Sequence, residues 1–131
     1  MPNAQLLQFG GSLLAILALA WLVSRLGLGQ GRRIADEAEA VFLAQEAVDG
    51  FEPVATAIDA DGRGALLRSK TGAIMLLKVH GAHVAARLLT RAARADASEG
   101  AITVHSGERR FGAATLTIDD PGHWAEAIRA L

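Results

Sequence analysis

The chain has 131 residues, a formal net charge of −1 from 13 basic and 14 acidic side chains, and no cysteine. This length is typical of one domain, or of one small domain with an appendage. A nucleic-acid-binding domain carries a basic excess, so the near-neutral charge argues against a nucleic-acid partner. Without cysteine the chain has no disulfide, no thiolate zinc site and no cysteine nucleophile. Hydrophobic residues make up 51% of it, which is too apolar for a disordered chain.

Residues 1–28 are predicted to form a membrane anchor. No charged side chain occurs before Arg25, and residues 6–28 are mostly Leu, Ala, Ile, Val, Phe and Trp. Twenty-three residues of helix rise roughly 34 Å, enough for a hydrocarbon core of about 30 Å. The alternative is a cleaved signal peptide, because Ala18-Leu19-Ala20 resembles a cleavage site. That interpretation lacks a positive n-region, and the apolar run continues past Ala20. We therefore expect an uncleaved single-pass helix, with the lipid bilayer as its partner.

The residues flanking this helix predict its orientation. No Lys or Arg precedes the apolar run, whereas Arg25, Arg32 and Arg33 follow it. Because positive charge is retained on the cytoplasmic side, we expect the C-terminal domain in the cytoplasm, at the inner membrane of a bacterium. Gly11 and Ala15 form a pair of small residues four apart, a spacing that favours close helix packing and predicts a homo-oligomer.

Residues 29–32 form the predicted Gly-rich linker. Gly27 and Gly29 match half of a dinucleotide-binding fingerprint, but Arg32 stands where the third glycine belongs. The run also follows a membrane helix instead of the strand of a βαβ unit, which that motif requires. We therefore interpret the glycines as a linker.

Residues 33–131 are predicted to form an α+β domain. Helical spacing of small apolar residues, period-two alternation and turn-forming dipeptides mark its elements. The expected elements are a helix over 33–49, strands over 54–58, 64–69 and 73–79, a helix over 82–95, strands over 101–105 and 111–118, and a helix from Pro121. The order α-βββ-α-ββ-α predicts one mostly antiparallel five-stranded sheet with about three helices packed on it.

The closing helix is expected to begin with Asp120 as its cap and Pro121 as its first residue. Its buried face would contain Trp124, Ile128 and Leu131. A final helix with a tryptophan after a sheet resembles pleckstrin-homology-like domains, but five strands are too few for their barrel. The sequence therefore supports no family assignment.

Basic residues recur on the helix expected over 82–95. Arg87, Arg91 and Arg94 have the spacing of one helix face, and Arg109 and Arg110 lie near a predicted hairpin turn. These five arginines are the candidate contact with the anionic inner leaflet or with an acidic patch on a second membrane protein. A solvated helix face is the alternative.

Candidate catalytic groups are few. His80 and His83 are three residues apart, but they straddle a predicted strand-to-helix junction and match no zinc motif. Asp119, Asp120 and His123 would suit acid–base chemistry in a cleft, although helix capping also explains the second aspartate. The chain has no phosphate-binding loop and no nucleophile elbow, so no cofactor or metal is expected.

These features predict a small, non-catalytic accessory or interaction protein anchored in a bacterial membrane assembly. The bacterial assignment rests on eleven arginines against two lysines with abundant alanine and glycine, as in GC-rich genomes. The alternative is a module that binds a small ligand or lipid in a pocket lined by Leu76, Leu88 and Phe111. The third hypothesis is a metal-dependent enzyme that uses histidines and carboxylates.

Overall fold

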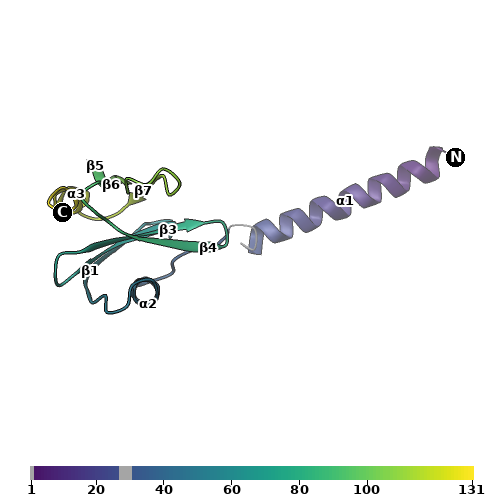
Figure 1. The fold of residues 1–131 in the computed structure, drawn as a ribbon. Helices are drawn as coiled ribbons and strands as arrows, with labels where there is room; N and C mark the ends of the chain where they lie inside the picture. Colours follow the sequence, from purple (N-terminus) through teal and green to yellow (C-terminus); the bar gives the residue numbers. More distant parts are fainter. Residues whose placement is uncertain (1, 27–30) are drawn as a thin grey trace. The chain divides into compact units, whose positions relative to one another are not determined.

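A computed structural model describes residues 2–26 and 31–131 (Figure 1). The chain divides into two compact units, Met1–Gly31 and Arg32–Leu131. Its elements are α1 (Pro2–Leu26), α2 (Glu37–Ala47), β1 (Pro53–Ile58), β2 (Gly64–Ser69), β3 (Ile74–His80), β4 (His83–Leu88), β5 (Arg94–Ser98), β6 (Ala101–His105), β7 (Ala113–Thr117) and α3 (Pro121–Arg129).

Helix α1 accounts for the first unit. Its segment Asn3–Leu26 has a mean hydropathy of 2.1 and is long and apolar enough to cross a membrane. Large apolar side chains such as Leu7 and Phe9 are more than three-quarters exposed. An apolar helix of this length and composition is typical of a membrane span.

The second unit contains two antiparallel sheets. Sheet A has the strand order β1-β2-β3-β4, and sheet B has the order β5-β6-β7. Helix α2 lies against one face of sheet A, while sheet B and α3 lie against the other (Figure 1). The α+β class and the antiparallel pairing expected from the sequence are therefore confirmed.

Sheet A is buried on both faces, which explains the apolar sequences of its central strands. Leu66 and Leu76 point into a first core that they share with sheet B and α3. Leu67 and Leu77, their neighbours along the strands, point into a second core under α2. Because successive side chains alternate between faces, a strand covered on both sides is apolar at nearly every position.

Helix α2 confirms the helix predicted over 33–49, although it is shorter at both ends. Its N-cap is Asp36, whose side chain accepts a 2.9 Å hydrogen bond from the Glu39 N–H. The Glu39 carboxylate in turn accepts from the Ala35 N–H and lies 2.6 Å from a guanidinium nitrogen of Arg32, as an ion pair without hydrogen-bond alignment. The bond to Asp36 satisfies one donor that the first helical turn leaves open, and the contacts of Glu39 fix the residues that precede the helix.

The prediction of a helix over 82–95 is wrong. Its residues form β4, a loop and the start of β5, so residues 31–131 contain seven strands in two sheets instead of five in one. A two-residue turn with Gly81 at φ +63° places His80 opposite His83 and pairs β4 with β3. Without β4, the N–H and C=O groups along that edge of β3 would lose their partners, and this hairpin pairing outweighs the helical pattern of apolar residues. The number of strands is therefore no longer an argument against a resemblance to pleckstrin-homology-like domains.

The remaining predicted elements are confirmed with small shifts. The second hairpin is β6 and β7, and α3 begins at Pro121 with Trp124 and Ile128 buried. The expected side-chain cap is wrong: Asp120 has a left-handed backbone (φ 58°) and its carboxylate makes no capping hydrogen bond. A residue that caps a helix with its side chain typically has an extended backbone at that position.

Candidate partner-binding groove

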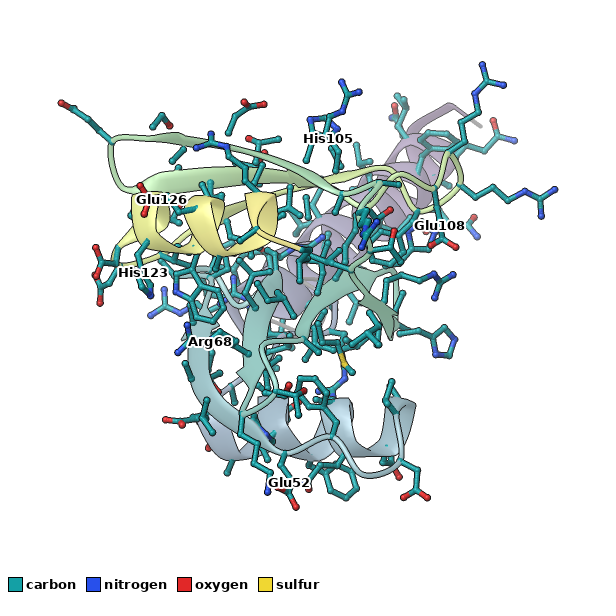
Figure 2. All side chains as sticks on the ribbon, turned by 60° about the vertical axis from the view of Figure 1, so that its left-hand side comes forward. Glu52, Arg68, His105, Glu108, His123 and Glu126 are labelled. Atoms are coloured by element: carbon teal, nitrogen blue, oxygen red, sulfur yellow. The ribbon has the colours of Figure 1, made fainter. Side chains whose placement is uncertain are left out.

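A groove of about 340 Å³ lies between the outer edge of β1 and helix α3. We call it the β1–α3 groove. Figure 2 shows Arg68 from sheet A and His123 from α3 on the same side of the domain. Its lining residues are Ala55, Thr56, Ala57, Ile58, Arg68, Asp119, Asp120, His123, Trp124 and Ala127.

The strand edge along the groove carries free backbone groups. Strand β1 pairs with β2, and among the described residues no strand pairs with its other edge. The Asp59 N–H donates to the Gly64 carbonyl at 2.9 Å, so alternation in an antiparallel ladder turns the backbone groups of Ile58 and Thr56 outward. The next outward group, the Ala60 N–H, already donates to Thr117 of sheet B. The unpaired part of the β1 edge therefore begins at Ile58, directly before the hydrogen bond between Ala60 and Thr117.

Small side chains make the floor of the groove. Ala55 and Ala57 project from β1 against the first core, which includes Trp124 of α3. At the far end, a bulge interrupts the β1–β2 register between Pro53 and Ala55. Proline and a bulge both discourage strand pairing, so the usable edge is short.

The two ends of the groove have opposite charge. Arg68 is the register partner of Ala55, and it also lines a hollow with Ala127 and Leu131, near the end of α3. No hydrogen bond or ion pair joins its half-buried side chain to another described residue. The acidic end contains Asp119 and Asp120, which follow β7. Thr117 of β7 is hydrogen-bonded to Asp59 and Ala60, which directly follow β1. The carboxylates of Asp119 and Asp120 therefore lie beyond the Ile58 end of β1.

Asp120 at the acidic end has an unusual backbone. Within residues 2–26 and 31–131, it is the one non-glycine residue with a positive φ. A left-handed conformation costs a non-glycine residue roughly 1–2 kcal/mol, and a following proline restricts the backbone further. Conformations of this kind concentrate at functional sites.

The acid–base set expected at Asp119, Asp120 and His123 lines the groove, but its members make no hydrogen bond to one another among the described contacts. The described residues contain no group of three His, Asp or Glu side chains able to hold a metal ion. His80 and His83 are exposed register partners in the β3–β4 hairpin.

The helical stripe of three arginines does not exist, because its residues are not on one helix. Arg87 lies on β4, where its Nε donates to the Glu108 carboxylate at 2.6 Å and its guanidinium lies 5.1 Å from the centre of the Phe111 ring. These contacts hold the β6–β7 loop against sheet A. Arg87 is therefore occupied within the domain.

The other four arginines of that candidate surface converge at one end of sheet B, which we call the basic end. Arg94 begins β5 opposite His105, the last residue of β6. Arg91 precedes β5, while Arg109 and Arg110 lie between β6 and β7. The two loops are in contact, since a Cβ added at Gly107 would lie 2.8 Å from that of Ala92.

The predicted membrane-flanking residues fall in both units. Arg25 is in the last turn of α1, with its guanidinium 5.4 Å from the Trp21 ring centre. In the second unit Arg32 is paired with Glu39 and Arg33 is exposed. Of the predicted linker 29–32 and anchor 1–28, residues 1 and 27–30 lie outside the described residues.

Gly11 and Ala15 are both exposed on α1, and a Cβ added at the glycine would contact nothing within 4 Å.

The apolar pocket expected between Leu76, Leu88 and Phe111 is not formed. Leu76 and Phe111 belong to the packed first core, whereas Leu88 is 45% exposed.

No family model matches this sequence, and comparisons with curated proteins and with solved structures find no significant match.

Proposed function

We propose that this protein is a single-pass, membrane-anchored accessory protein that holds a partner in the β1–α3 groove. It is a non-catalytic component of a bacterial inner-membrane assembly, with residues 33–131 on the cytoplasmic side. The apolar length of α1 supports the anchor, and the position of Arg25, Arg32 and Arg33 after it supports the orientation.

The observation that carries this proposal is the combination of groups along one groove. Free backbone donors and acceptors of β1 lie beside a floor of small apolar side chains, between an unpaired arginine and two aspartates. Apolar surface with a few convergent polar groups is the usual composition of a binding site. An exposed strand edge is also a ready template for pairing with another chain.

Photo-crosslinking in intact membranes tests the groove as a contact site. A photoreactive amino acid is placed at Thr56 on the strand edge or at His123 on the helix, with Gln45 on the exposed side of α2 as the control. We expect both groove positions to yield the same membrane-protein adduct and Gln45 to yield none. An absence of adducts at the groove, or equal adducts at Gln45, contradicts the proposal.

The basic end favours a second function, contact with an anionic membrane surface. Arg91, Arg94, Arg109 and Arg110 are all exposed there. Each basic residue close to an anionic leaflet contributes about 1 kcal/mol of attraction. This contact would orient the domain without occupying the groove.

A further inference from the structure

We propose that the occupant of the β1–α3 groove is an extended peptide segment that adds to β1 as an antiparallel strand. Its basic side chain lies at Asp119 and Asp120, and its carboxylate, several residues later, lies at Arg68. This inference rests on the proposed function, because it specifies the partner of the same groove.

The backbone argument comes from the free edge of β1. The outward groups of Thr56 and Ile58 are at the positions that a further strand would bond, directly after the bond between Ala60 and Thr117. An extended peptide satisfies such groups with its own main chain, as in strand addition to a sheet edge. Every strand pair of sheet A is antiparallel, and antiparallel pairing is slightly more stable per residue than parallel pairing.

The lining of the groove limits which side chains the added peptide can carry. Alternate side chains of an added strand point to opposite faces of the sheet. Those on the inner face would meet Ala55, Ala57 and Trp124, where alanines leave room for β-branched residues. Pairing stops at Pro53 and the adjacent bulge, which limits the segment to the length between the two charged ends.

The charges of the groove set the direction of the peptide. An antiparallel segment begins beside Ile58 and ends beside Ala55, whose register partner is Arg68. Its N-terminal side therefore approaches Asp119 and Asp120, and its C-terminal side approaches the unpaired guanidinium. From Ile58 to Ala55 the strand rises about 10 Å, so the basic and acidic residues lie at least three positions apart. A ligand of a single charge sign would meet repulsion at one end.

A displayed peptide library tests this polarity on the full-length protein in neutral detergent micelles. The peptides have a core of alternating valine and threonine, flanked on each side by two randomised positions. We expect selection to enrich Lys or Arg on the N-terminal side and Asp or Glu on the C-terminal side, each by up to about fivefold, as for partly exposed ion pairs. Enrichment of the opposite polarity, or none, overturns the inference.

A charge reversal in the groove gives the matched test. In the Arg68→Glu variant we expect the C-terminal preference to switch from acidic to basic residues, while the N-terminal preference stays basic. Arg91→Glu, which reverses an exposed arginine outside the groove, should leave both preferences unchanged. A switch in the preferred charge does not depend on the overall affinity for the peptides. If Arg68→Glu fails to fold, the selection on the unsubstituted protein still tests the inference.

The two proposals fail separately. Adducts at Thr56 and His123 without any peptide polarity show a groove partner of another kind, and they overturn the strand-addition inference alone. The absence of groove adducts overturns the proposed function itself.

Discussion

The Thr117 N–H donates a 2.7 Å hydrogen bond to Oδ1 of Asp59, and this bond joins the end of β7 to the end of β1. The second carboxylate oxygen accepts from the Arg63 N–H at 3.1 Å. Asp59 is only 6% exposed, and both of its side-chain oxygens accept from backbone donors, one in β7 of sheet B and one in the turn between β1 and β2. The same contact brings Asp119 and Asp120 to the groove.

Replacing this aspartate should destabilise the domain and disturb the groove together. Asp59→Ala leaves two backbone donors without their acceptor, and we expect it to lower the free energy of unfolding by about 2 kcal/mol. Asp59→Asn retains an acceptor and should cost less. Denaturant unfolding measures both, with the exposed Asp61→Ala as a control that stays within about 0.5 kcal/mol of the parent. An equal effect of Asp61→Ala would contradict this role.

The strained residue at the acidic end gives a prediction of opposite sign. Asp120→Gly should raise the free energy of unfolding by about 1 kcal/mol, because glycine adopts a φ of 58° without steric cost. Asp120→Asn should leave stability nearly unchanged, since asparagine also tolerates this conformation. Both variants remove the charge, so each should weaken the preference for a basic residue on the N-terminal side of the peptide. Thermal unfolding of the two variants separates the effect of the backbone conformation from the effect of the charge. A glycine variant that is less stable than the parent protein would refute the strain argument.

The anchor is tested by placing charges in the middle of α1. Each central arginine costs about 2.5–3.5 kcal/mol on insertion scales, so Leu17→Arg with Leu19→Arg should largely abolish membrane spanning. We expect the protein to move from the membrane pellet to the soluble fraction with its strand and helix signal intact in circular dichroism. Both cores of the second unit are drawn from Ile34 onward, which supports this expectation. The double alanine variant is the control, and an arginine variant that resists alkaline extraction would contradict the anchor.

The basic end makes a prediction about lipid composition. In nanodiscs with anionic lipid, amide hydrogen exchange should slow in the β6–β7 loop relative to neutral lipid, because Arg109 and Arg110 would lie at the anionic surface. Reversing both charges to glutamate should remove the difference. Helix α2 provides the internal reference. Equal exchange rates in the two lipids would contradict surface contact.

Local signals predicted much of the fold. Alternation and turn residues located β1, β2, β3, β6 and β7, and the Pro121 start located α3. The segment 82–95 was misassigned because its spacing of Val84 and Leu88 also fits a helix. What decides its structure is the register with β3, from Met75 opposite Leu88 to His80 opposite His83. That pairing depends on the turn at Gly81 and on the edge that β3 would otherwise leave open, neither of which the apolar spacing within 82–95 contains.

The groove was predictable only in part. Asp119, Asp120 and His123 are neighbours in the chain, so the sequence could identify them as a group. Their juxtaposition with Arg68 is tertiary, because it depends on how sheet B and α3 pack on sheet A. One signal was available: Arg68 is the single charged residue in the strand Gly64–Ser69, which is buried at nearly every position, so a charge with no role there would be costly.

Groove filling combined with crosslinking is the most direct test of the account. Ala127 is half-buried at the groove, so Ala127→Phe would occupy it without enlarging a packed core, whereas Ala47→Phe adds the same ring on exposed α2. The account predicts that the Thr56 adduct in intact membranes is lost with Ala127→Phe and retained with Ala47→Phe. An adduct that persists in the filled groove would show that the partner does not bind there, and it would contradict the account.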